Sequence, residues 1–220
     1  MLVTIRIEKG WDIRHATQVA TLYEEAFGAK FQRAIPDKKQ RILVLSKSFV
    51  TEFSFVAYSD DKIVGLSGFN VREGSLTGGI GAKGLIHQLG LFAGLWASAV
   101  FSLFERTPKK GELVMDGIAV DSDYRGQGIG SQLLDQIILH AQDNGFNSVR
   151  LDVIDSNPRA KKLYESKGFV ATKVESFPYL KWLVGFSGST TMILDLSTLK
   201  SLAKAINSAA GAVSQTRLAN

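Results

Sequence analysis

Apolar and polar residues follow one another along this chain in patterns that predict strands and helices in turn. Strict alternation or short apolar runs predict strands over residues 2–8, 111–120, 147–155, 169–176 and 189–197. Residues 52–73 read as an antiparallel hairpin that turns at Asp60 and Asp61. Helical spacing predicts helices that start near Asp12 and Pro36 and others over 129–144 and 156–168. Residues 198–220 read as a terminal helix that frays into a tail.

Residues 75–110 interrupt this order with the apolar run LIHQLGLFAGLWASAVFSLF at 85–104, which is about as long as a bilayer span. Polar residues within the run, and its position between two strands of one expected sheet, weaken a membrane-spanning interpretation. Small residues recur at every fourth position, namely Gly90, Gly94, Ser98 and Ser102. A bulky stripe runs beside them, namely Leu85, Leu89, Phe92, Trp96, Val100 and Leu103. We expect burial against the domain or a second copy, a lid over an apolar pocket, or membrane contact.

Composition limits the classes of protein and of ligand. The chain has 220 residues, 45% of them hydrophobic and 21% charged, which suits one globular domain with an insertion. It has no cysteine, so disulfides, thiolate zinc sites and a cysteine nucleophile are excluded, and a cytoplasmic location is expected. The three histidines are far apart, and we expect no metal site. The charged N-terminal residues do not resemble a signal peptide.

Net charge is +5, yet no Lys/Arg-rich run with interleaved aromatic residues occurs, so we expect no nucleic-acid partner. A small ligand that carries phosphate would account for the charge equally well. The stretch DYRGQGIGSQLLDQ at 123–136 suits such a ligand, because a helix start presents unpaired N–H groups and a partial positive charge. Its glycines would let an anion approach the backbone, and Arg125 would add a fixed charge. A tight strand-to-helix turn without a ligand is the alternative.

A second glycine motif, GIGAKG at 79–84, formally matches the G-x-G-x-x-G of dinucleotide-binding oxidoreductases. The strand before it reads as part of a hairpin, and the run after it is too apolar for an ordinary crossover helix. An acidic residue about 20 positions further on, which would contact the ribose, is missing. The sequence therefore disfavours this interpretation.

AVDSDYRGQGIGSQLL and the later LDVIDSNPRAKKLYESKGF together resemble the two signature motifs of the GNAT superfamily of N-acetyltransferases. The first resembles its acetyl-CoA loop through Arg125, Gly128 and Gly130. The second resembles its Asn, Ala, Leu-Tyr and Gly-Phe helix, here met by Asn157, Ala160, Leu163, Tyr164, Gly168 and Phe169. The resemblance covers about residues 1–74 and 111–197. It implies an α/β fold, a mixed and largely antiparallel twisted sheet flanked by helices.

The resemblance also implies how acetyl-CoA binds as co-substrate, without a metal. The pantetheine arm would hydrogen-bond the backbone of Ile118, Ala119 and Val120. The pyrophosphate would be wrapped by Arg125, Gly126, Gln127, Gly128, Ile129 and Gly130, mainly through backbone N–H groups. Asn157 would contact the pantetheine or neighbouring amides, and Tyr164 would lie by the thioester sulfur.

Three residues are candidates for proton transfer. Tyr164 could protonate the leaving thiolate. Asp152 lies between Leu151 and Val153, at a position where some family members carry an acidic base, and Asp116 lies in the strand before the first motif. Burial in an apolar strand would raise the pKa of either carboxyl and suit it to act as a base. A side chain that points to solvent, or a water molecule acting as base, stays open.

We therefore expect an acetyltransferase domain over residues 1–197, which contains the apolar insertion 75–110, followed by a C-terminal segment at 198–220. The activity would be transfer of acetyl from acetyl-CoA to a primary amine of a small molecule or peptide. Acetylation of protein N-termini or lysines is the alternative reaction, and a non-catalytic acyl-CoA sensor is the alternative class. Among the three interpretations of the apolar insertion, membrane contact is the least favoured, and a homodimer is allowed.

Overall fold

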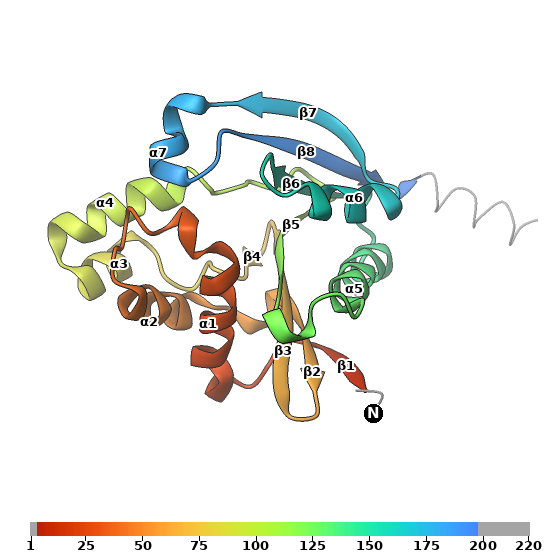
Figure 1. The fold of residues 1–220 in the computed structure, drawn as a ribbon, viewed down its shortest axis with the longest axis horizontal. Coiled ribbons are helices and arrows are strands. Elements are labelled where there is room, and N and C mark those ends of the chain that lie inside the picture. Colours follow the sequence, from red (N-terminus) through yellow and green to blue (C-terminus); the bar gives the residue numbers. More distant parts are fainter. Residues whose placement is uncertain (1–3, 198–220) are drawn as a thin grey trace, which may run out of the picture.

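The computed structural model describes residues 4–197 (Figure 1). Its strands are β1 Ile5–Lys9, β2 Ser54–Ser59, β3 Lys62–Val71, β4 Gly74–Ser75, β5 Glu112–Val120, β6 Ser148–Ile154, β7 Val170–Ser176 and β8 Gly188–Asp195. Its helices are α1 Ala16–Phe27, α2 Lys38–Ser48, α3 Ala82–Leu89, α4 Leu91–Ser102, α5 Ile129–Asp143, α6 Pro158–Ser166 and α7 Lys181–Val184. The predicted strands are confirmed, as are the helices over 129–144 and 156–168. The predicted terminal helix at 198–220 lies outside the described residues, so the division into a domain and a tail stays a prediction.

The strands form one sheet in the order β1-β2-β3-β5-β6-β8-β7, and β4 pairs with β3. Within the described chain every neighbouring pair is antiparallel except β5 and β6, which run parallel. The expected mixed, largely antiparallel α/β fold is therefore confirmed.

β5 and β6 separate soon after they begin. They pair only from Glu112 opposite Ser148 to Val114 opposite Arg150, although β5 continues to Val120 and β6 to Ile154. The second halves of both strands consequently turn unpaired backbone edges toward one another. We call this region the strand divergence.

Two cores cover the two faces of the sheet, and the alternation along β2 divides them. Phe55 and Ala57 contribute to the core beneath α5, while Val56 and Tyr58 contribute to the core beneath α1. The buried face of α5 is the one expected from helical spacing, with Ile129, Leu133, Leu134, Ile137 and Ala141 buried. On one face α5 begins shortly after β5 ends, and on the other face the last turns of α1 lie against β5 through Tyr23 and Phe27.

Aspartates fix the starts of the first two helical segments. Asp12 accepts a hydrogen bond from the Arg14 N–H and caps a 3-10 turn that leads into α1. Asp37 accepts from the N–H groups of Lys39 and Gln40 and caps α2. The predicted start of α2 at Pro36 is therefore wrong, because the capping carboxylate lies one residue later.

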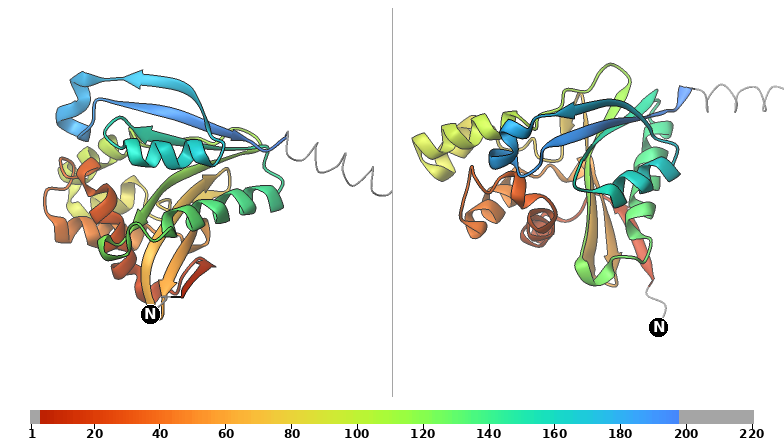
Figure 2. Two further views of the ribbon diagram at one scale, coloured as in Figure 1. Left: turned by 45° about the vertical axis from the view of Figure 1, so that its right-hand side comes forward. Right: turned by 45° about the horizontal axis from the view of Figure 1, so that its top comes forward.

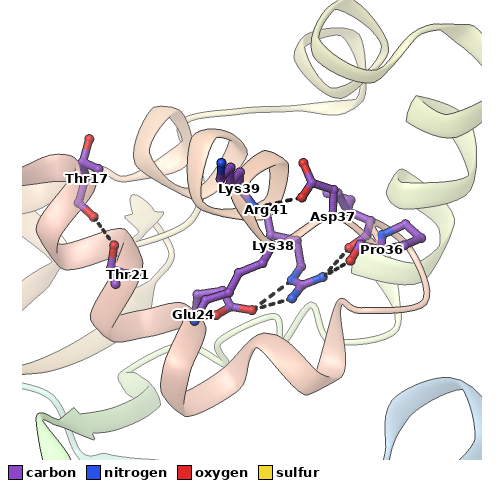
Figure 3. A network of polar contacts seen from close by, with 9 residues as sticks. Thr17, Thr21, Glu24, Pro36, Asp37, Lys38, Lys39 and Arg41 are labelled. Carbon is purple, nitrogen blue, oxygen red and sulfur yellow. Dashed lines mark hydrogen bonds and ion pairs between the residues drawn. The ribbon is translucent and has the colours of Figure 1, made fainter.

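A buried ion pair joins α1 to α2 and to the loop between them (Figure 3). The Glu24 carboxylate accepts from Nε and Nη2 of Arg41 at 3.0 and 2.6 Å. The Arg41 Nη1 donates to the carbonyls of Ile35 and Pro36 at 2.7 and 2.9 Å. Because all these groups are satisfied inside the protein, the connection from residue 31 to residue 37 is held in one position. Glu24 is therefore buried, although a glutamate on a helix next to another glutamate is more often solvated.

Residues 85–104 do not form one long helix. The chain breaks at Gly90, where φ is +83°, and α3 and α4 fold back on one another. A side chain at Gly94 would collide with the backbone of Ile86, so this small position allows the close approach expected of the small stripe. Among residues 4–197, no helix has the length and hydropathy needed to cross a membrane.

The α3–α4 pair lies beside α2 and α7, at the opposite end of the molecule from α5 and α6 (Figures 1 and 2). Leu85 and Val100 are buried there against residues of α2 and α7. Leu89 is partly buried there as well, whereas within this one chain Phe92 is 86% exposed and Trp96 and Leu103 are each 45% exposed, so that cover of these three by a second copy or a membrane stays a prediction. The stripe was drawn along one helix, whereas the break at Gly90 turns α4 so that Gly94 and Ala97 face inward.

Candidate functional site

The loop before α5 presents a row of unpaired backbone donors. Within the described residues, the N–H groups from Gly126 to Ser131 have no hydrogen-bond acceptor, and the first helical bond runs from the Gln132 N–H to the Gly128 carbonyl at 3.0 Å. No side chain caps this helix. A helix start that is left open in this way favours an anion.

Gly128 has the left-handed conformation, with φ +81° and ψ 0°. A side chain there would be strained, and it would project into space that no protein atom fills except Gln132 Nε2 at 3.9 Å. The glycine is therefore required by the backbone, and it leaves the space in front of the helix start free for a ligand.

Arg125 lies exposed beside this space. Its Nε donates to the carbonyl of Val120 at 3.0 Å, which fixes the side chain against the end of β5. Neither Nη atom has a partner among the described residues. The predicted charge at the loop is thus held in place with two donor groups available.

The end of β5 offers backbone groups to the strand divergence. The Asp121 N–H donates to the Val64 carbonyl at 2.9 Å, and the antiparallel register with β3 continues without a shift to Ile118. Alternation along an antiparallel strand then directs the backbone groups of Ala119 toward β3 and those of Ile118 and Val120 toward the divergence. Of the three residues predicted to bind pantetheine, Ile118 and Val120 are better placed.

α6 positions the second motif. The Asn157 side-chain oxygen accepts from the Ala160 N–H at 3.1 Å and caps the helix, as predicted, with its amide nitrogen exposed. Tyr164 is 7% exposed and packs beside Phe169 in the core under α5. Burial raises the pKa of Tyr164 to about 12, and its hydroxyl makes no hydrogen bond with any residue that the structure describes. The phenol therefore stays protonated at neutral pH.

Asp116 lies where β5 bulges against β3. The register shifts between Gly68 and Phe69, so that Asp116 is the residue without a partner. Its carboxylate accepts from the Tyr23 hydroxyl of α1 at 3.0 Å. Burial raises the pKa of Asp116, and the nearby Lys30 ammonium and the Tyr23 hydrogen bond offset part of that rise.

Asp152 has more hydrogen-bond partners than Asp116, the other candidate base. Its carboxylate accepts from Arg106 Nε at 2.7 Å and from Thr191 Oγ1 at 2.6 Å. Leu151 and Val153 point into the core under α5, so Asp152 projects from the opposite face of β6. Its role as a base stays a prediction, but its oxygens already have partners.

The fold brings three further residues near the two aspartates, namely Tyr23, Lys30 and Arg106, and none of them belongs to a sequence motif. Tyr23 lay on a helix face that pattern alone assigns to the core. Arg106 ends the apolar insertion, and Lys30 ends the 3-10 turn Gly28–Lys30 after α1. No local motif marks either cation, because their positions depend on how distant segments meet.

Comparison with known proteins places these features in a family. The family model described as the acetyltransferase (GNAT) family matches residues 16–169. A thialysine N-epsilon-acetyltransferase of Bos taurus is 40% identical over 62 residues, which are 28% of this chain and 36% of that protein. The [ribosomal protein bS18]-alanine N-acetyltransferase of Escherichia coli K12 is 43% identical over 58 residues, 26% of this chain and 39% of that protein. The matched segments thus span less than two fifths of these curated relatives.

Solved structures share the fold across most of the chain. The Salmonella typhimurium protein yncA, solved with its cofactor acetyl-CoA, matches with a TM-score of 0.55 at 16% identity, covering 87% of this chain and 94% of that chain. At that identity the likeness concerns the arrangement of elements alone.

Proposed function

The chain belongs to the acetyltransferase (GNAT) family, and we propose that it transfers the acetyl group of acetyl-CoA to a primary amine. One observation carries the proposal. The open helix start at Gly128 and the unpaired edge of β5 lie next to each other, because a side chain at Gly130 would be only 3.7 and 3.8 Å from the side chains of Ile118 and Val120. The backbone groups that would bind a pyrophosphate and those that would bind an amide-rich arm therefore form one continuous surface.

The loop before α5, the end of β5 and Asn157 offer the groups that acetyl-CoA would need for binding. The N–H groups from Gly126 to Ser131 would bind the pyrophosphate, with Arg125 adding charge-assisted hydrogen bonds. Backbone groups of Ile118 and Val120 would hold the pantetheine, and the exposed amide nitrogen of Asn157 would contact it. Bound acetyl-CoA supplies the acetyl group as a thioester, whose C–S bond breaks as the new C–N bond forms.

We assign the base to Asp116 rather than to Asp152. The acceptor must lose a proton before or during attack, and a carboxyl of raised pKa is a better proton acceptor than an ordinary one. Asp116 has one hydrogen bond, from Tyr23, whereas Asp152 has a guanidinium and a hydroxyl. Its ion pair with Arg106 keeps the Asp152 oxygens occupied, so Asp152 would position the end of the insertion.

Tyr164 would protonate the leaving thiolate from the other face of the sheet. Its hydroxyl has no partner in the described chain and is protonated at neutral pH because its pKa is about 12. Asp116 approaches from the α1 face, so the acid and the base would act from opposite sides of the strand divergence.

The acceptor is an amine whose identity the fold does not specify. One relative is named for the side-chain amine of thialysine and another for an alanine of a ribosomal protein. A small-molecule amine and a protein N-terminus are both consistent with a site bordered by α1, the insertion and α7. We propose a cytoplasmic location on the basis of the missing cysteines alone.

Steady-state kinetics on matched variants test the assignment. We expect Asp116→Asn and Tyr164→Phe each to lower kcat by about 10²-fold or more, within the range for general acid–base groups, while acetyl-CoA affinity changes little. Asp152→Asn is the matched control and should cost less. The limb of the pH profile due to Asp116 should lie above the ordinary aspartate value of about 3.9, and activity should fall as pH drops through it.

Two results would contradict this mechanism. A greater loss from Asp152→Asn than from Asp116→Asn would move the base to β6. Unchanged kcat in Tyr164→Phe, with chemistry limiting the rate, would assign the tyrosine to packing. Binding of acetyl-CoA without turnover of any amine would favour a sensor.

A further inference from the structure

A lysine near Asp116 has a charge that the protein leaves without a partner. Lys30 Nζ lies 5.1 Å from the ring centroid of Phe27 and 5.8 Å from that of Phe104. Phe27 ends α1 and Phe104 follows α4, so the ammonium lies where α1 and the insertion meet. Both rings present their faces to the cation, which stabilises it in a partly desolvated place.

The ammonium has no anionic partner within reach. Among residues 4–197, Lys30 forms no ion pair within 4.0 Å and donates no hydrogen bond to a protein group. The charged groups that act on it are Asp116, Arg106 and Asp152. Burial lowers the pKa of Lys30, so water only partly replaces the missing partners. A partly buried ammonium with no acceptor is unfavourable unless something else binds it.

The other charged groups around Lys30 already have hydrogen-bond partners. Asp152 accepts from Arg106 and Thr191. Arg106 also donates from Nη1 to the carbonyls of Leu103 and Glu105. Asp116 accepts from Tyr23. Within the described part of this site, Arg106 is thus already paired with a carboxylate, whereas Lys30 has no ion-pair partner and can bind an additional anion.

We propose that Lys30 binds an anionic group, foremost a carboxylate, which the acceptor carries in addition to its amine. The inference rests on the proposed acetyl transfer and narrows its substrate class to amines of the amino-acid type. Lys30 and Asp116 carry opposite charges and lie close enough for each to act on the pKa of the other. An acceptor with both charges would be oriented with its amine toward Asp116 and its carboxylate toward Lys30. An amine without the anion would lose that orientation and leave the ammonium unpaired.

Pairs of acceptors that differ only in the carboxylate provide the test. Release of CoA thiol would be followed with L-lysine against cadaverine, L-ornithine against putrescine, and L-phenylalanine against phenethylamine. O-Phosphoethanolamine against ethanolamine would show whether phosphate is preferred to carboxylate. We expect the wild type to favour the carboxylate-bearing member of an accepted pair by about tenfold or more in kcat/KM, the size of one charge-assisted hydrogen bond.

The Lys30→Met variant keeps the apolar stem against Phe27 and Phe104 but removes the charge. The ratio of kcat/KM between the two members of a pair should then fall by about tenfold, mainly through KM of the carboxylate-bearing one, and Lys30→Arg should restore part of it. Thermal unfolding of each variant would show that the fold is kept.

Three outcomes would overturn the inference. The wild type could show no preference within any pair, or the phosphate-bearing amine alone could be preferred. Lys30→Met could slow both members equally, which would mean that the lysine acts only on the ionisation of Asp116. If acetyl-CoA binds but no amine in the panel is acetylated, the proposed reaction is rejected independently of the proposed role of Lys30. The subsite is then decided by calorimetry of the L-amino acids on wild type and Lys30→Met, and equal binding would reject it.

Discussion

α4 and α5 both begin directly after a glycine with positive φ, yet the two glycines have different consequences. Gly90 has φ +83° and Gly128 has φ +81°. The Gly90 N–H donates to the Ile86 carbonyl and ends α3, so this glycine reverses the chain between two helices. At Gly128 the neighbouring N–H groups have no acceptor in the described chain, so this glycine opens a helix start to a ligand.

The two helices also bury their apolar residues differently. α5 packs its whole apolar face into the central core, whereas α4 leaves Leu91, Phe92, Leu95 and Trp96 between 45% and 86% exposed. Glycine before a helix therefore does not by itself indicate a ligand. α4 also starts without a side-chain cap, but at α5 the row of unpaired N–H groups extends back to Gly126 and Arg125 lies beside it. An apolar helix likewise indicates a core only when polar residues define its outer face.

The largest expected difference between the two helices is in stability. Leu134 of α5 is fully buried, and Leu134→Ala should lower the free energy of unfolding by about 2–5 kcal/mol because it leaves a cavity. Phe92→Ala in α4 should change it by at most about 0.5 kcal/mol, because the ring is exposed in the monomer. Urea titrations at equal protein concentration would measure both. A loss of several kcal/mol from Phe92→Ala would show that a second copy or another part of the chain covers α4.

A smaller difference should separate two helical glycines. A methyl group at Gly94 would meet the backbone of Ile86, so Gly94→Ala should cost about 1–3 kcal/mol through overpacking. Gly130→Ala places its methyl group in ordinary contact with Ile118 and Val120 and should be neutral or stabilising by up to about 1 kcal/mol. Thermal unfolding of the two variants would compare them. Equal stability would mean that α3 and α4 do not approach as closely as the structure shows.

Local pattern was sufficient for the fold and for the loop before α5. The alternation in 52–73, the apolar face of 129–144, the Asn157 cap and the two motifs are all properties of neighbouring residues, and each expectation about the elements was confirmed. The same reasoning failed at α4, where nearly every residue is apolar or small. Without polar residues, the spacing of apolar positions does not show which face of the helix is buried. The break at Gly90 also rotates α4 relative to α3, so a stripe drawn through both helices does not lie on one face.

Only those residues of the candidate site that lie in or near a sequence motif were predicted. Arg125 to Gly130 and Tyr164 belong to motifs, whereas Tyr23, Lys30 and Arg106 come together from α1 and the end of the insertion. The choice between Asp116 and Asp152 also depended on partners far apart in sequence, Tyr23 for one and Arg106 for the other. Pairings of this kind follow from the tertiary arrangement, which periodicity does not encode.

Calorimetric titration of acetyl-CoA into wild type, Gly128→Val and Gly90→Val tests the central claim most directly. Both variants place a side chain at positive φ before a helix, in open space, so both should lose stability through backbone strain, by about 1–2 kcal/mol at the left-handed Gly128 and by about 1–3 kcal/mol at Gly90, where ψ is 168°. Only Gly128→Val should weaken acetyl-CoA binding, by at least about tenfold or 1.4 kcal/mol, because its side chain enters the space assigned to the pyrophosphate. Equal affinity in wild type and Gly128→Val, or an equal loss in Gly90→Val, would contradict the assignment of the Arg125 to Gly130 loop as the acetyl-CoA site.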